Sequence, residues 1–208
     1  MGHVLVNPYA FGASFVVDSA DFDGTNDYMT RGAGLTGAVD SKLFSFVSWF
    51  RLDGSDASLL RLFDNTGNAL SVIRNALDKI RVVAENAVGT GILDINTTST
   101  FVTGATWRCL MCSVDLADAA KRHLYIGDVN ELNVVTYTND TIDFTVADWA
   151  TGSNVAGTTK FNGCLAEIWF APGVYIDFSV EANRRLFISA AGKTVNLGTD
   201  GSIPTGTA

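Results

Sequence analysis

Short runs in which apolar and other residues alternate recur along this chain, and they constrain its fold more than any other feature. In the clearest run, residues 44–52, one side of an extended strand would carry Phe44, Phe46, Phe50 and Leu52, and the other Ser45, Val47, Trp49 and Arg51. Similar runs, rich in β-branched or aromatic residues, occur at 79–85, 107–114, 123–126, 132–138 and 164–171. We therefore expect a chain built mainly of β-strands.

Turn-forming residues separate most of these runs. Asp or Asn stands beside or near glycine at 23–24, 53–54, 65–67, 127–128 and 162–163. Such residues adopt left-handed or turn-initiating conformations and join antiparallel strands. The pattern contains no long helices that would alternate with parallel strands, so the expected fold is an all-β sandwich of two stacked antiparallel sheets.

The length of 208 residues suits one sandwich domain, which we expect to span residues 15–190. An N-terminal arm, 1–14, would precede it, and an extended C-terminal tail, 191–208, would follow. One short helix is expected near the end, capped by Asp177 or Ser179 and running to about Phe187 or Ile188. The tail is rich in glycine and threonine and offers little to bury, so we expect neighbouring subunits to hold it.

Composition and charge exclude several classes of partner. The formal net charge is −8 with only 14 Lys and Arg, and these form no cluster, so neither nucleic acid nor an anionic membrane is an expected partner. No run approaches the roughly twenty apolar residues of a transmembrane helix, and the first residues lack a secretory signal pattern. Three cysteines, an odd number, favour a reducing compartment.

Four segments, in order, resemble the signatures of the concanavalin A-like family of laminin G and pentraxin type. They are Ala20–Tyr28 with its Phe22-Asp23-Gly24, Phe46–Leu52 with its Trp49, Leu124–Asp128, and Phe161–Phe170. This resemblance covers roughly residues 15–190 and implies a jelly-roll sandwich. The closing part, from Trp169 to Gly201, also resembles segments of tailed-phage and prophage proteins.

Catalytic patterns are missing from the sequence. Glycoside hydrolases that share the resembled fold carry Glu-x-Asp-x-x-Glu on one strand, whereas the four glutamates here, Glu85, Glu131, Glu167 and Glu181, are scattered. There is no GxSxG, no GxxxxGK[ST], and only two histidines could serve as a base. We expect a protein that is not an enzyme.

The sequence offers two candidate ligand sites. Laminin G and pentraxin domains bind calcium at loop carboxylates and carbonyls, and the resemblance makes Asp64 and Asn65 the best metal candidates. Trp149 and Asp148 lie next to a loop and are the candidates for ligand binding, because Trp49, Trp107 and Trp169 fall in expected strands and would pack in the core.

The Cys109-x-x-Cys112 pair could be a redox pair or half a metal site, but nothing completes a tetrahedron. Two buried apolar residues are the expected interpretation.

These observations lead to one main hypothesis and an alternative from another class. We expect a non-enzymatic structural protein of a tailed-phage virion, assembled in the host cytoplasm, that decorates the capsid or joins the tail by contacting other virion proteins and copies of itself. The alternative is a lectin-like, glycan-binding module of a receptor-binding tail protein, with surface glycan as its partner. No cofactor is expected, and calcium is the candidate ion. A divergent glycosidase with Glu167 as its acid is a third alternative.

Overall fold

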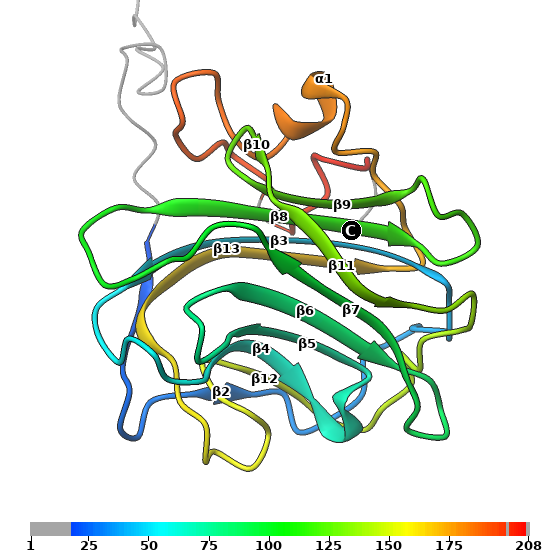
Figure 1. The fold of residues 1–208 in the computed structure, drawn as a ribbon, viewed down its shortest axis with the longest axis horizontal. Helices are drawn as coiled ribbons and strands as arrows, with labels where there is room; N and C mark the ends of the chain where they lie inside the picture. The colour runs from blue at the N-terminus through cyan, green and yellow to red at the C-terminus, as the bar shows by residue number, and fades with distance from the viewer. Residues whose placement is uncertain (1–17, 199, 207–208) are drawn as a thin grey trace, which may run out of the picture.

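Two antiparallel sheets stack face to face in the computed structural model, which describes residues 18–198 and 200–206 (Figure 1). The six-stranded sheet has the order β1 (Ala20–Asp23), β13 (Asn162–Pro172), β3 (Leu43–Leu52), β8 (Arg108–Asp115), β9 (Arg122–Ile126), β10 (Val129–Asn130). The seven-stranded sheet has the order β11 (Leu132–Tyr137), β7 (Gly91–Thr97), β6 (Ile80–Glu85), β5 (Leu70–Arg74), β4 (Leu60–Asn65), β12 (Trp149–Thr151), β2 (Met29–Thr30). The predicted all-β sandwich is confirmed.

The main core lies between the two sheets. The predicted inner side of β3, formed by Phe44, Phe46, Phe50 and Leu52, is fully buried there. Leu70 and Val72 of β5 and Ile80 and Val82 of β6 belong to the same apolar cluster and come from the facing sheet. The period-two pattern thus predicted correctly which side chains of β3 enter the core.

A second apolar cluster covers the outer face of the six-stranded sheet. Val47 and Trp49 of β3 pack there against Phe178, Phe187 and Leu197, among others. These partners belong to residues 173–198 and 200–206, here named the cover segment, which lies over that face in orange and red (Figure 1). Both faces of β3 are consequently buried, which is why its burial is continuous rather than alternating.

The predicted short helix near the end is confirmed, but its cap and length and one predicted turn were wrong, and three strands were missed. The helix α1 spans only Glu181–Arg184, and its N-cap, Val180, has no side-chain capping bond. Asp177 instead accepts hydrogen bonds from the backbone N–H and hydroxyl of Ser179, which makes a local turn. The expected turn at 162–163 is the start of β13, where Gly163 pairs with Leu52. Finally, β4, β5 and β7 were not anticipated. β4 and β5 are buried almost throughout and therefore show no clear alternation.

The expected N-terminal arm, 1–14, lies outside the described residues, and the domain boundaries at 15 and 190 stay predictions. The cover segment includes much of the expected tail, and Trp169 Nε1 donates a hydrogen bond of 2.9 Å to Gly201 O within it. In the part of the chain that the structure describes, no helix is long and apolar enough to cross a membrane.

His123 links β9 to the cover segment and should make its docking sensitive to pH. Its Nε2 lies 2.7 Å from the Tyr175 hydroxyl and 3.1 Å from Asp177 Oδ1. Burial lowers the pKa of His123 below its usual 6.5, although Asp177 opposes that shift. Because the folded-state pKa is depressed, the folded state prefers neutral imidazole, and the associated stability is present above pH 6.5 and is lost as pH falls through the folded pKa.

We expect hydrogen-exchange protection of the Phe187 and Ile188 amides, which both donate to Arg184 O, to fall between pH 7 and pH 5 after correction for intrinsic exchange. The loss should approach about tenfold per pH unit only between the ordinary pKa of 6.5 and the lower folded pKa, as for one coupled proton, and should level off below the folded pKa. In His123→Gln the decline should disappear. An equally steep decline in that variant would assign the pH dependence of protection to another titratable group.

Candidate functional site

Four side chains from separate parts of the chain form a row across the outer face of the six-stranded sheet. Asp21 of β1 lies opposite Cys164 of β13, which lies opposite Arg51 of β3. Trp107 directly precedes β8 and continues the row, with its ring centroid 5.7 Å from Arg51 Cζ. Strand register alone therefore brings together residues that are far apart in the sequence.

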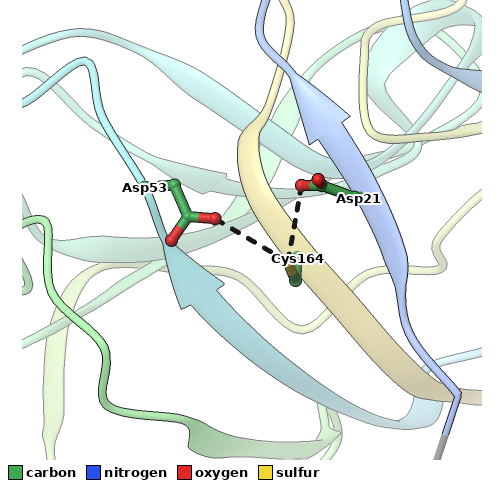
Figure 2. Close-up of side chains that lie close together, drawn as sticks. All are labelled: Asp21, Asp53 and Cys164. Carbon is green, nitrogen blue, oxygen red and sulfur yellow. Dashed lines mark hydrogen bonds between the residues drawn. The ribbon is translucent and has the colours of Figure 1, made fainter.

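Arg51 is held in place by its acidic and thiol neighbours. It donates two hydrogen bonds to Asp53, of 2.8 and 2.7 Å, and its Nη2 lies 3.1 Å from Cys164 Sγ. Figure 2 shows the thiol between the carboxylates of Asp21 and Asp53, at 3.4 and 3.7 Å. The bidentate pairing with Asp53 holds the Arg51 guanidinium in a single orientation.

Asp21, Asp53 and Cys164 could in principle hold a metal ion, since one ligand atom of each lies within 4.8 Å of the others. The guanidinium of Arg51 already occupies the cationic position beside them, and its hydrogen bonds hold the pKa of Asp53 below its usual value. Burial, assisted by Asp21, raises the pKa of Cys164 to about 11. The cluster is therefore a hydrogen-bonded support for Arg51 in which the thiol keeps its proton at neutral pH.

The raised pKa predicts slow alkylation of Cys164. At pH 8, a thiol with a pKa of about 11 forms about a hundredfold less thiolate than one with the ordinary value of 9.0, so iodoacetamide should modify it correspondingly slowly. Asp21→Asn removes a negative charge beside the thiol, so this variant should react faster. Mass spectrometry of the peptide that contains Cys164, followed over time, measures both rates. Alkylation of the unchanged protein at the rate of a free thiol would contradict the assignment.

A pocket of about 560 Å³ opens beside the row, and we name it the Trp107 pocket. Its lining includes Trp49, Arg51, Thr106, Trp107, Lys193 and Thr194. Trp107 is partly exposed, whereas Trp49 is 5% exposed and forms part of the outer cluster. The cover segment supplies Lys193 and Thr194, which follow a turn closed by the bridge between Ile188 and Thr194.

The pocket combines an indole surface with unused hydrogen-bond donors. Arg51 Nη1 has no hydrogen-bond partner in residues 18–198 and 200–206, and neither has Lys193 Nζ. The hydroxyls of Thr106 and Thr194 add groups that can donate or accept. An apolar ring with a few convergent polar groups is the usual composition of a small-ligand site.

Trp149 is not the exposed platform that the sequence led us to expect. Its side chain is 3% exposed and stacks in the main core, 5.4 Å from the rings of both Phe63 and Phe170. The reason is that β12 pairs with β4 and becomes part of the seven-stranded sheet. Asp148 accepts hydrogen bonds of 2.8 Å from the N–H groups of Gly32 and Trp149. A ligand-binding role for Trp149 and Asp148 stays a prediction, without the exposed ring that suggested it.

Asp64 and Asn65, the predicted metal residues, end β4 and are each 3% exposed. Arg61 Nη1 donates a hydrogen bond of 2.6 Å to Asp64, and the Ser71 hydroxyl also donates to it. Burial nevertheless raises the pKa of Asp64. Asn65 Nδ2 donates to Leu70 O at 3.0 Å. A guanidinium already balances the carboxylate, which disfavours calcium here, and the calcium site stays a prediction.

Cys109 and Cys112 lie on opposite faces of β8. Cys109 belongs to the outer cluster and Cys112 to the main core. Residues three apart on a strand point in opposite directions, so the two thiols cannot act as one redox or metal pair. The expected interpretation as two buried apolar residues is confirmed.

Sequence reasoning missed Trp107 and Lys193. Trp107 was placed inside a core strand, although β8 starts one residue later, at Arg108. The available signal was its position directly after the loop Thr103-Gly104-Ala105-Thr106. Lys193 lies in the expected tail, where no packing partner could be read from the sequence.

Comparisons with known proteins identify the fold but not a family. No protein-family model matches the chain, and neither does any curated protein sequence. A native heptameric SAP-like pentraxin from Limulus polyphemus superposes with a TM-score of 0.51 at 10% identity, over 73% of this chain and 74% of that one. A putative carbohydrate binding protein from Bacteroides ovatus gives 0.58 at 12% identity, over 78% of this chain and 45% of that one.

A third structure is the CBM40 of the Ruminococcus gnavus IT-sialidase bound to α2,3-sialyllactose, with a TM-score of 0.53 and 13% identity. It is matched over 79% of this chain and 96% of its own length, whereas this chain spans less than half of the Bacteroides protein. These comparisons give no support to a phage link. The similar structures are lectin-type β-sandwiches of concanavalin A-like, laminin G-like and pentraxin kind, and this chain shares their fold.

Proposed function

We propose that this chain is a glycan-binding module and that the Trp107 pocket is its sugar site. The observation that carries the proposal is the partly exposed Trp107 ring beside two cationic groups with free donors, Arg51 and Lys193. Carbohydrate-binding proteins among the similar structures are consistent with such a role for this fold. Fold alone does not assign function, so the pocket carries the argument.

Each lining residue has a definite task in this proposal. The apolar C–H face of a sugar ring packs on Trp107, while Arg51 Nη1 and Lys193 Nζ donate to sugar oxygens. Asp53 keeps the guanidinium pointing in one direction, which reduces the entropy lost when the ligand binds. Thr106 and Thr194 supply hydroxyls that exchange hydrogen bonds with the ligand.

The pocket is better suited to binding than to hydrolysis. Two carboxyl groups within several ångströms of the bond are the usual requirement for glycoside hydrolysis. Among the described residues, no Asp or Glu lines the Trp107 pocket. Glu167, the acid considered from the sequence, lines a different groove. These facts support a non-catalytic role.

A glycan array probed with the purified protein tests the proposal. We expect a saturable ligand whose affinity falls at least about tenfold in Trp107→Ala, because the stacking surface is lost, and is largely retained in Trp107→Phe. Lys193→Met should weaken the same ligand without changing the melting temperature. The proposed site would be refuted if the folded protein bound no arrayed glycan. It would also be refuted if Trp107→Ala bound the ligand as tightly as the unchanged protein does.

The virion role stays a separate hypothesis based on the resemblance of the closing segment. One observation in its favour is the edge strand β11, where Val134 and Val135 are exposed and available for protein contacts. Quantitative mass spectrometry of purified particles would decide it. Hundreds of copies per particle would indicate a capsid decoration, a few dozen a tail component, and none would remove the virion hypothesis.

A further inference from the structure

Among residues 18–198 and 200–206, the second half of β13 is paired along one edge only. β3 pairs with β13 from Gly163 to Pro172, but on the opposite side β1 pairs with it only from Asn162 to Leu165. Within residues 18–198 and 200–206, no other backbone hydrogen bond reaches this edge between Ala166 and Phe170. The unpaired N–H and C=O groups of such an edge can pair with an added strand.

A groove of about 820 Å³ runs along this edge, and we name it the edge groove. The loop 31–39 forms one wall, and residues from Leu197 to Thr205 of the cover segment form the other. Exposed apolar side chains lie in it, including Val39, 69% exposed, and Val174, 37% exposed. The groove therefore offers an open strand edge together with apolar contacts for alternate side chains of a guest strand.

A β-bulge in β13 directs Glu167 into the edge groove. The register with β3 shifts between Ala166 and Trp169, and Glu167 has a φ of 47°, a conformation uncommon for a residue other than glycine. Bulges of this kind re-aim a side chain and are frequent beside functional sites. The strain indicates that the position of Glu167 is set by its surroundings rather than by local preference.

The Glu167 carboxylate lacks a cationic partner in the described part of the chain. Arg31, the cation of the groove, donates instead to Gly34 O and the Thr36 hydroxyl. Desolvation raises the pKa of Glu167, so the half-buried carboxylate would gain from a cation. Asp200 adds a second acid to the groove lining. The groove has a net negative charge.

We propose that the edge groove is a docking site for an extended peptide of a partner protein, which adds a strand to β13 and places a Lys or Arg side chain against Glu167. The proposal is independent of glycan binding in the Trp107 pocket, because the two sites share no Asp, Glu, Lys or Arg. A second copy of this chain is a poorer guest. Two-fold pairing through the same edge would bring two acidic grooves together, and the carboxylates would repel.

An arrayed library of N-acetylated, C-amidated heptapeptides tests this proposal. The unchanged protein should select peptides with Lys or Arg at one fixed position, flanked by β-forming residues. Glu167→Lys should reverse that preference to Asp or Glu, whereas Glu181→Lys, the same charge change on the exposed face of α1, should leave it unchanged. Thermal melts of all three proteins establish that they are folded. The proposal is overturned if the unchanged protein selects no peptides, or if Glu167→Lys selects the same peptides as the unchanged protein.

Backbone pairing is tested with N-methylated forms of the best selected peptide. Successive N–H groups of a strand point to opposite edges, so N-methylation at alternate positions should abolish binding in one register and be tolerated in the other. Equal sensitivity in both registers would overturn strand addition. A concentration-dependent dimer in analytical ultracentrifugation that Glu167→Lys abolishes would assign the groove to a second copy and equally overturn the proposal.

Discussion

Alanine in place of Gly163 should prevent stable folding of this domain. The residue lies where β13 begins to pair with β3, and its φ of 144° is a conformation that L side chains rarely adopt. An added Cβ would lie 2.0 Å from the backbone oxygen of Arg51, and backbone cannot move aside as a flexible side chain can. We expect a loss of at least about 3 kcal/mol in the free energy of unfolding.

Gly91→Ala is the matched control, because Gly91 begins β7, has no positive φ and has nothing within 4 Å of an added Cβ. It should change stability by less than about 0.5 kcal/mol. Urea unfolding followed by tryptophan fluorescence compares the variants. If both substitutions had equally small effects, the close packing of β13 on β3 at Gly163 would be wrong.

Replacement of Arg74 by alanine should produce the second large loss in the free energy of unfolding. Arg74 ends β5, and its side chain is 0% exposed. The guanidinium forms ion pairs with Asp56 and Asp78 and also donates to Ser55 O, so it ties the loop after β3 to the turn after β5. Its removal leaves a cavity where a fully buried side chain stood and takes the cation away from Asp78, which is 19% exposed. We expect a cost of about 3 kcal/mol, limited because Asp56 retains contact with water.

Arg81→Ala provides the comparison for this second experiment. Arg81 also forms a bidentate pair with an aspartate, Asp94, but its side chain is 36% exposed. A pair in contact with solvent contributes little, so the expected loss is below about 1 kcal/mol. The denaturant midpoints of Arg74→Ala and Arg81→Ala compare the two losses of stability directly. A larger effect for Arg81 than for Arg74 would show that burial does not determine the contribution of these arginines.

The strands most accessible to prediction were those with a distinct period. In β3 the sequence assigned Phe46 and Val47 to opposite faces, and the structure places them in separate apolar clusters. β5 was missed because neighbours on both sides bury all of its residues, which erases alternation. The length of α1 was overestimated because Asp177, a good capping residue, is used in a turn instead.

The candidate site was less accessible than the fold, because it depends on register between distant strands. Asp21, Arg51, Trp107 and Cys164 become neighbours only when β1, β13, β3 and β8 align. Single-residue context also misled the choice of tryptophan. Trp149 beside a polar loop is buried by the pairing of β12, and Trp107, predicted to lie inside a core strand, is partly exposed. Exposure depends on tertiary packing, which the residues next to Trp107 and Trp149 in the sequence do not indicate.

The cover segment forms one wall of the Trp107 pocket. Gly192, Lys193 and Thr194 belong to that segment, and the rest of the lining comes from the sheet and the residues next to its strands. A ligand that contacts both parts binds only the docked arrangement, so its binding free energy adds to the stability of docking. Saturating ligand should consequently slow exchange of the Ile188 amide. Protonation of His123 should weaken ligand binding by the same factor by which bound ligand weakens protonation of His123. The sandwich would thus supply one half of the binding site, and residues 192–194 of the cover segment the half that completes it.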